Sequence, residues 1–185
     1  MTDVFIIHGA YGNPQENWYP WLKSELERLN CNVFVPRFPT PTDQTLDNWQ
    51  KIFATHKARL DENTIIIGHS LGAAFLLRVL EDIKTQIKAA FFISGFTENL
   101  NNPVFDEINK TFIDKRYDWD RIKKSSKRFY VFHSDNDPYI ALKQGKNMAQ
   151  NLGAEMITIK GAGHFNENSG YKKFPELLEK IKNEL

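Results

Sequence analysis

The chain has 185 residues, a length that predicts one domain spanning residues 1–185. Hydrophobic residues make up 41% of the sequence, enough to build a core without disulfides or metals. The 24 basic and 23 acidic residues leave a net charge of +1, so the chain lacks the basic excess expected of a nucleic-acid-binding protein. The single cysteine, Cys31, excludes an internal disulfide and a multi-cysteine zinc site.

Apolar runs in the sequence are short. The longest near the middle, Ala89–Ile93, falls far below the roughly 20 residues that cross a bilayer. The first residues carry Asp3 and no basic stretch, unlike a signal peptide. We therefore expect a cytoplasmic protein that makes no contact with membranes.

Short apolar runs alternate with amphipathic segments along the whole chain. The runs are rich in Val, Ile and Phe, which is typical of strands covered on both faces. They predict six strands: Val4–His8, Asn32–Val35, Thr64–Gly68, Ala89–Ser94, Phe129–His133 and Glu155–Lys160. The intervening segments predict helices near 17–29, 45–60, 71–83, within 101–126, 139–151 and 171–183. This alternation predicts an α/β protein with a three-layer, doubly wound, mostly parallel sheet, whose ligands bind beyond the carboxyl ends of the strands.

The strongest local motif is Gly68-His69-Ser70-Leu71-Gly72, between a predicted strand and a predicted helix. It has the G-x-S-x-G spacing of a nucleophile elbow, a strained turn that lifts a serine above the sheet edge. Ser70 is therefore the predicted nucleophile. The alternative is a plain glycine-rich turn that binds a phosphate, although the spacings of dinucleotide and P-loop sites are missing.

A serine hydroxyl needs a general base, and the base must itself be oriented by an acid. In this class of site the acid and then the histidine follow the serine along the chain. His164 follows the last predicted strand, in Gly161-Ala162-Gly163-His164-Phe165, and is the predicted base. The alternative is an exposed loop histidine with no chemical role.

Two candidate acids, Asp135 and Asp137, follow the strand that ends at His133. We favour Asp137 because it begins the loop-to-helix turn, where it would also cap a helix that has Pro138 in its first position. The spacing His133-x-Asp135-x-Asp137 also allows a metal site, a weaker hypothesis because no second cluster completes a coordination shell. We expect no metal and no other cofactor.

An acyl-transfer site also needs hydrogen-bond donors for a developing oxyanion. The backbone N–H of Leu71 is the first candidate, because it directly follows the serine. The second is the N–H of Ala10, in the glycine-rich loop after the first strand. The alternative is a glycine turn that only connects strand and helix. We expect His8 to brace this loop and His69 to pack beside the elbow.

Together these motifs resemble the α/β-hydrolase superfamily, and more narrowly the small retinoblastoma-binding protein nine / YdeN-like serine hydrolases. The resemblance covers nearly the whole chain: the N-terminal glycine loop with Trp18-Tyr19, the elbow, Trp119–Lys123, Asp137-Pro138 and Gly163-His164-Phe165. It implies a minimal α/β-hydrolase fold without a cap domain, Ser-Asp-His chemistry with Asp137 as the acid, and esterase or amidase activity.

Two features depart from the family pattern. The elbow reads His-Ser-Leu-Gly, nearer the general lipase and esterase form than the small-residue variants of this family. Residues Leu29–Val33 only half match a Leu-x-Cys-x-Glu retinoblastoma-binding motif, because Val33 stands where the acid should be. We therefore expect no retinoblastoma-type partner.

Only about 34 residues lie between the fourth and fifth predicted strands, too few for a large lid. We expect an open or shallow pocket for a small-molecule acyl substrate, walled by Tyr11, Phe96, Trp119 and Phe165. The predicted function is a serine hydrolase that cleaves a small ester, thioester or amide through an acyl-enzyme on Ser70. The alternatives are an acyltransferase that uses the same residues, and a non-catalytic protein-binding module on a hydrolase fold.

Overall fold

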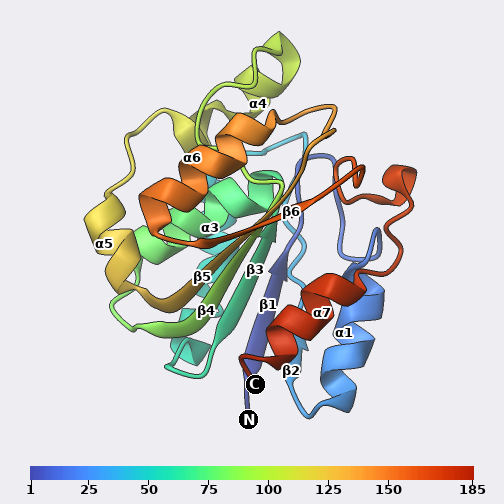
Figure 1. Cartoon of the computed structure of the whole chain (residues 1–185). Coiled ribbons are helices and arrows are strands. Elements are labelled where there is room, and N and C mark those ends of the chain that lie inside the picture. The colour runs from blue at the N-terminus through green and yellow to red at the C-terminus, as the bar shows by residue number, and fades with distance from the viewer.

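A six-stranded, all-parallel sheet forms the centre of the protein (Figure 1). The computed structural model describes residues 1–185 and orders the strands β2-β1-β3-β4-β5-β6. The strands are β1 (Asp3–Ile7), β2 (Asn32–Phe34), β3 (Ile65–His69), β4 (Ile87–Ile93), β5 (Ser126–Ser134) and β6 (Glu155–Ile159). The predicted α/β class and parallel sheet are confirmed, and each observed strand overlaps the predicted one.

Helices cover both faces of the sheet (Figure 1). One face carries α1 (Tyr19–Arg28) and α7 (Pro175–Lys182). The other carries α2 (Leu46–Ala54), α3 (Leu71–Asp82), α4 (Pro103–Ile113), α5 (Trp119–Lys124) and α6 (Leu142–Leu152). Two short 3₁₀ helices, η1 (Lys57–Arg59) and η2 (Glu167–Ser169), lie in connecting segments. No helix in the structure combines the length and the apolarity that crossing a bilayer requires.

The strands are apolar without interruption because the sheet is buried on both sides. In β1, Val4 and Ile6 join the core beneath α1 and α7, whereas Phe5 and Ile7 join the core beneath the other helices. All four side chains are fully buried. Since successive residues of a strand point to opposite faces, a sheet between two helix layers needs apolar residues at both sets of positions.

The strand order reverses beside β1, and this reversal positions the site. The chain adds β2 on one side of β1 and then places β3 to β6 on the other side. Open parallel sheets form a crevice where the connections leave in opposite directions, at the carboxyl ends of the strands. The loop after β1 and the turn after β3 meet in this crevice, so Gly9, Ala10 and Ser70 line one cavity.

Some helices differ from the predicted segments, and side-chain hydrogen bonds explain why. The helical region within 101–126 divides into α4 and α5, because the guanidinium of Arg78 binds the carbonyl oxygens of Phe112 and Lys115 where α4 ends. Helix α6 begins at Leu142, not near residue 139, and its N-cap is Ala141. The prediction that Asp137 caps this helix is therefore wrong.

Candidate active site

Ser70 occupies a strained turn between β3 and α3. Its backbone has φ +56° and ψ −119°, a combination that residues other than glycine rarely adopt. The two flanking glycines are required by close backbone contacts. A Cβ on Gly68 would lie 2.5 Å from the carbonyl oxygen of Gly72, and a Cβ on Gly72 would lie 2.6 Å from that of His8. The turn at Ser70 thus has the strained backbone geometry that the sequence predicts.

The loop after β1 approaches Ser70 closely. A Cβ on Gly9 would lie 2.9 Å from Cβ of Ser70, so only glycine fits there without displacing the serine. The N–H of Tyr11 donates to Oγ1 of Thr40 at 2.6 Å, whereas the N–H of Ala10 has no hydrogen-bond partner in the protein. Ala10 therefore has a free donor beside Ser70.

His8 holds this loop through two hydrogen bonds. Its Nδ1–H donates to the carbonyl oxygen of Gly9 at 2.9 Å, and its Nε2 accepts from the N–H of Phe38 at 3.0 Å. These two bonds fix one neutral tautomer of the ring. Burial lowers the pKa of His8, which agrees with that neutral form. His8 braces the loop, as the sequence predicts.

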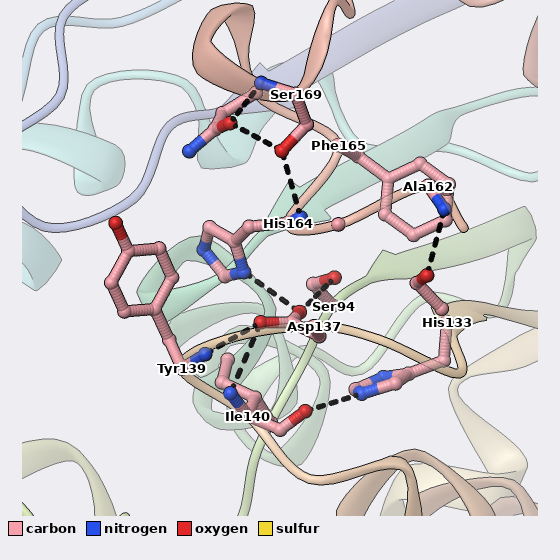
Figure 2. Close-up of polar contacts among 12 residues, drawn as sticks. Ser94, His133, Asp137, Tyr139, Ile140, Ala162, His164, Phe165 and Ser169 are labelled. Carbon is pink, nitrogen blue, oxygen red and sulfur yellow. Dashed lines mark hydrogen bonds and ion pairs between the residues drawn. The ribbon is translucent and has the colours of Figure 1, made fainter.

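Asp137 and His164 form a buried pair at the same edge of the sheet (Figure 2). Nδ1 of His164 donates to Oδ2 of Asp137 at 2.8 Å. Oγ of Ser94, at the end of β4, donates to the same oxygen at 2.7 Å. The other oxygen, Oδ1, accepts from the N–H groups of Tyr139 (2.9 Å) and Ile140 (3.1 Å), which closes a turn ahead of α6.

The carboxylate of Asp137 is therefore fully buried yet fully hydrogen-bonded. Burial by itself would raise the pKa of Asp137, but the hydrogen bonds from His164, Tyr139 and Ser94 outweigh it and hold that pKa below its usual range. Asp137 is thus an anion that orients the imidazole of His164 and leaves Nε2 of that ring free to accept a proton. Ser94 is a partner that sequence patterns do not reveal, because its contact depends on the pairing of β4 with β5.

Asp135 bonds to the backbone of the His164 loop, whereas Asp137 bonds to the imidazole of His164. Its Oδ1 accepts from the N–H of Gly161 at 2.8 Å. The neighbouring Ser134 and Asn136 accept from Ala162 (3.0 Å) and Gly163 (2.7 Å) in the same way. The segment after β5 thus holds the backbone of the loop that carries the histidine, and the hydrogen bond to the imidazole goes to Asp137 instead.

His133 also has its own partner, since its Nε2–H donates to the carbonyl oxygen of Ile140 at 3.0 Å. His133, Asp135 and Asp137 are therefore engaged with three separate groups and do not converge on one point. The alternative of a metal site built from their spacing finds no support in this geometry.

His69 supports the His164 loop from within the elbow. The hydroxyl of Tyr19 donates to Nδ1 of His69 at 2.6 Å, and Nε2–H of His69 donates to the carbonyl oxygen of His164 at 2.8 Å. Burial, followed by the nearby His164, lowers the pKa of His69 to about 3, so this ring is neutral. His69 packs beside the elbow as predicted, but its hydrogen bonds to Tyr19 and His164 leave no signal in the sequence.

A cavity of about 430 Å³ contains Ser70 and His164 together with Ala10. Two of the predicted wall residues, Tyr11 and Phe96, line it. Residues that sequence patterns did not single out complete the wall, among them Glu16, Leu100, Phe105, Tyr139 and Asn166. Leu100 and Phe105 come from the loop after β4 and from α4, whose position the helical pattern alone does not fix.

The prediction that Trp119 and Phe165 line this cavity is wrong. Phe165 is fully buried in the core beneath α1 and α7, where its ring stacks on Phe174 with centroids 4.9 Å apart. Trp119 begins α5 and packs against the core beside Tyr117, at 5.3 Å between ring centroids. In both cases apolar burial away from the crevice decides the position of the ring.

Comparison with known proteins places this geometry in a family. Residues 4–183 match the model of the serine hydrolase family. The chain is 29% identical to the YdeN protein of Bacillus subtilis (strain 168) over 93% of this chain and 90% of that protein. It is 28% identical to serine hydrolase RBBP9 of Rattus norvegicus, over 100% of this chain and 96% of that protein. The crystal structure of the B. subtilis ydeN gene product superimposes with a TM-score of 0.93 at 27% identity, covering 99% and 98% of the two chains. The chain therefore belongs to the serine hydrolase family, among the small α/β-hydrolases similar to YdeN and RBBP9.

Proposed function

We propose that this serine hydrolase cleaves a small ester, thioester or amide through an acyl-enzyme on Ser70. The observation that carries the proposal is the buried Asp137–His164 pair, which lies in the same crevice as a serine held in a strained elbow. A serine hydroxyl is a weak nucleophile until a base removes its proton, and these residues supply an oriented base.

The reaction divides into two steps. Oγ of Ser70 attacks the carbonyl carbon while Nε2 of His164 takes the hydroxyl proton. The protonated imidazole, stabilised by the Asp137 anion, then gives that proton to the departing alcohol, thiol or amine as its bond to the carbonyl carbon breaks. A water molecule attacks the acyl-enzyme in the same manner, which releases the acid and restores Ser70.

The negative charge on the carbonyl oxygen needs donors during both steps. The free N–H of Ala10 beside Ser70 supports its assignment to this role. The N–H of Leu71, in the first position of α3, is the second proposed donor because it follows the nucleophile at a helix start. One such donor typically contributes about 10²–10³ in rate. The cavity of about 430 Å³ suits a small-molecule substrate.

The experiment that tests the proposal is labelling with a fluorophosphonate, which reacts covalently only with an activated serine. We expect one adduct per chain in the intact mass of the native protein and none with Ser70→Ala. We also expect Ser70→Ala to abolish ester hydrolysis without changing the circular dichroism spectrum. Folded native protein that gains no adduct would contradict the proposal and favour a non-catalytic binding module.

A further inference from the structure

The cavity around Ser70 has two unlike walls. One wall is mostly apolar and consists of Phe96, Leu100, Phe105, Tyr139 and Ile140, with Asn109 of α4 as its polar exception. The other wall is polar and consists of Glu16, Asn17, Asn166, Glu167 and Asn168. Ser70 lines the same cavity. Such a division selects a substrate whose two halves differ in polarity on either side of the bond that breaks.

The apolar wall ends in a chain of aromatic rings that leads to His164. The ring of Tyr139 meets the imidazole edge-on at 5.0 Å between centroids, and Figure 2 shows the two rings next to each other. Phe105 meets Tyr139 at 5.9 Å, and Tyr11 meets Phe105 at 6.2 Å, again edge to face. Another ring fits such an arrangement well, because edge-to-face contacts are the geometry that aromatic groups prefer.

Two of these rings, those of Tyr11 and Tyr139, are exposed to solvent. Tyr11 is 52% and Tyr139 is 45% exposed, which makes them two of the six large hydrophobic side chains that the structure leaves in water. Exposed apolar groups that gather at the mouth of a cavity mark a place where a ligand covers them. The apolar wall is therefore better satisfied with a ring bound against it.

The loop that supplies this wall is already held in its binding shape. The side chain of Gln144, on α6, accepts from the N–H of Thr97 at 3.0 Å and donates to the carbonyl oxygen of Asn99 at 3.1 Å. Asp106 accepts from the N–H of Leu100 at 2.6 Å. A preformed wall binds its ligand without the cost of ordering a loop.

The two walls belong to different sides of the nucleophile. The apolar wall residues follow β4 and β5, whereas Glu16 and Asn17 follow β1, on the other side of β3. Asn166, Glu167 and Asn168 follow β6, and their loop crosses over to Asn17. The N–H of Glu167 donates to Oδ1 of Asn17 at 2.8 Å, which joins the His164 loop to the polar wall. The leaving group must lie where His164 can protonate it. Both walls reach His164, the apolar wall through Tyr139 and the polar wall through the His164 loop itself. The polar wall is the leaving-group side, because its side chains can hydrogen-bond a small alcohol or amine.

We infer that the acyl half of the substrate carries an aryl group, which binds against Phe96, Phe105 and Tyr139, and that the leaving group is a small polar alcohol or amine. This inference rests on the proposed function, since it assumes that Ser70 forms the acyl-enzyme. The substrate class is thus an arylalkanoyl ester or amide.

Two isomeric esters test which side takes the ring. Methyl 3-phenylpropanoate carries the ring on its acyl half, and 2-phenylethyl acetate carries it on its leaving group; the two share one molecular formula. We expect kcat/KM, measured by proton release, to be at least about tenfold higher for methyl 3-phenylpropanoate, since a well-placed hydrophobic group discriminates by about 10–200-fold.

Phe105→Ala removes the middle ring of the wall and should reduce that preference to less than about threefold. Val104→Ala is the matched control, because Val104 lies next to Phe105 in the same helical turn but is 62% exposed and does not line the cavity. This control should keep both the activity and the preference of the native protein.

Equal rates for the two isomers, a reversed preference, or a preference that Phe105→Ala leaves intact would each overturn the inference. So would failure to hydrolyse either ester while Ser70 still reacts with the fluorophosphonate, a result that leaves the proposed nucleophile standing. Absence of the fluorophosphonate adduct would instead overturn the proposed function, and the assignment of the substrate with it.

Discussion

At the scale of single residues, the proton transfer proposed for His164 depends on how much negative charge Asp137 presents to it. Oδ2 of Asp137 shares that charge between two donors, Nδ1 of His164 and Oγ of Ser94. Ser94 is fully buried, so its hydroxyl is not exchanged for water. Ser94 therefore moderates the attraction between the carboxylate and a protonated imidazole.

Ser94→Ala should shift the acidic limb of the kcat/KM–pH profile to higher pH. Without the Ser94 hydrogen bond, the carboxylate stabilises the protonated imidazole more strongly, and the base becomes available only at higher pH. We also expect kcat/KM at neutral pH to fall by about 10- to 100-fold, because one hydrogen bond to a charged group contributes about 1.5–3 kcal/mol. The measurement is the pH profile of hydrolysis between pH 5 and pH 9.

Ser125→Ala is the control for that experiment. Ser125 is also buried, and its hydroxyl donates to the carbonyl oxygen of Ile122 at 2.7 Å, but it precedes β5 and so lies at the opposite edge of the sheet. This variant should leave the pH profile unchanged. A Ser94→Ala protein that loses activity while its acidic limb stays in place would show that Ser94 acts on folding alone.

At the scale of elements, the start of α3 is fixed by its approach to the backbone of β1. Alanine at Gly72 would normally favour a helix by about 1 kcal/mol. Here its Cβ would press against the carbonyl oxygens of Ile7 and His8, and neither can move without breaking the sheet. We expect Gly72→Ala to lower the free energy of unfolding by about 3 kcal/mol or more, or to prevent folding, because overpacking against rigid atoms costs about 1–3 kcal/mol and sometimes more.

Gly153→Ala provides the comparison, measured by urea denaturation of both variants. Gly153 ends α6 at φ +66°, and nothing lies within 4 Å of a Cβ placed there. Its substitution costs only the backbone strain of a left-handed residue, about 1–2 kcal/mol. Equal stabilities of the two variants would refute the steric explanation of the elbow glycines.

Local patterns determine much of this fold, which is why the sequence predicts it. A strand covered on both faces must be apolar throughout, so all six strands could be located before their partners were known. The elbow at Ser70 is likewise a five-residue signal. Asp137 and His164 follow it in a fixed chain order at the ends of strands, and that rule alone separated His164 from the other histidines.

Features that depend on distant contacts could not be found in this way. The break between α4 and α5 depends on Arg78, which lies in α3. Phe165 follows the proposed base directly, yet its ring belongs to the core on the other face of the sheet. The apolar wall around Phe105 forms only because α4 lies over the crevice, a position that an amphipathic pattern does not specify.

At the scale of the whole molecule, three buried histidines connect the site to the pH dependence of folding. His8, His69 and His133 each donate a hydrogen bond to one backbone carbonyl oxygen, in the loops that carry Gly9, His164 and Ile140. Burial lowers the pKa of all three below the ordinary value of 6.5, and that of His69 to about 3. Nδ1 of His133 is buried without any partner, so nothing there accepts a second ring proton.

The unfolded chain binds protons at these histidines below about pH 6.5, whereas the folded chain binds them only at lower pH, because their pKa values are lowered. Unfolding therefore takes up protons, and the free energy of unfolding should fall as the pH drops below that value. Each histidine that excludes its proton contributes a slope of about 1.4 kcal/mol per pH unit. Asp137 acts in the same direction at lower pH, since its lowered pKa stabilises the fold above the ordinary carboxyl range and loses that effect as the carboxylate is protonated.

Urea denaturation at pH 7.5, 6.5, 5.5 and 5.0 measures the slope of the free energy of unfolding against pH. In His69→Gln the amide keeps one acceptor for Tyr19 and one donor for His164, so the loop contacts remain. Unfolding should then take up about one proton fewer, which lowers the slope by about 1.4 kcal/mol per pH unit. Stability that is constant from pH 7.5 to 5.0, or a slope that His69→Gln does not reduce, would show that these rings are protonated in the folded protein and that the loops of the site are held by other contacts.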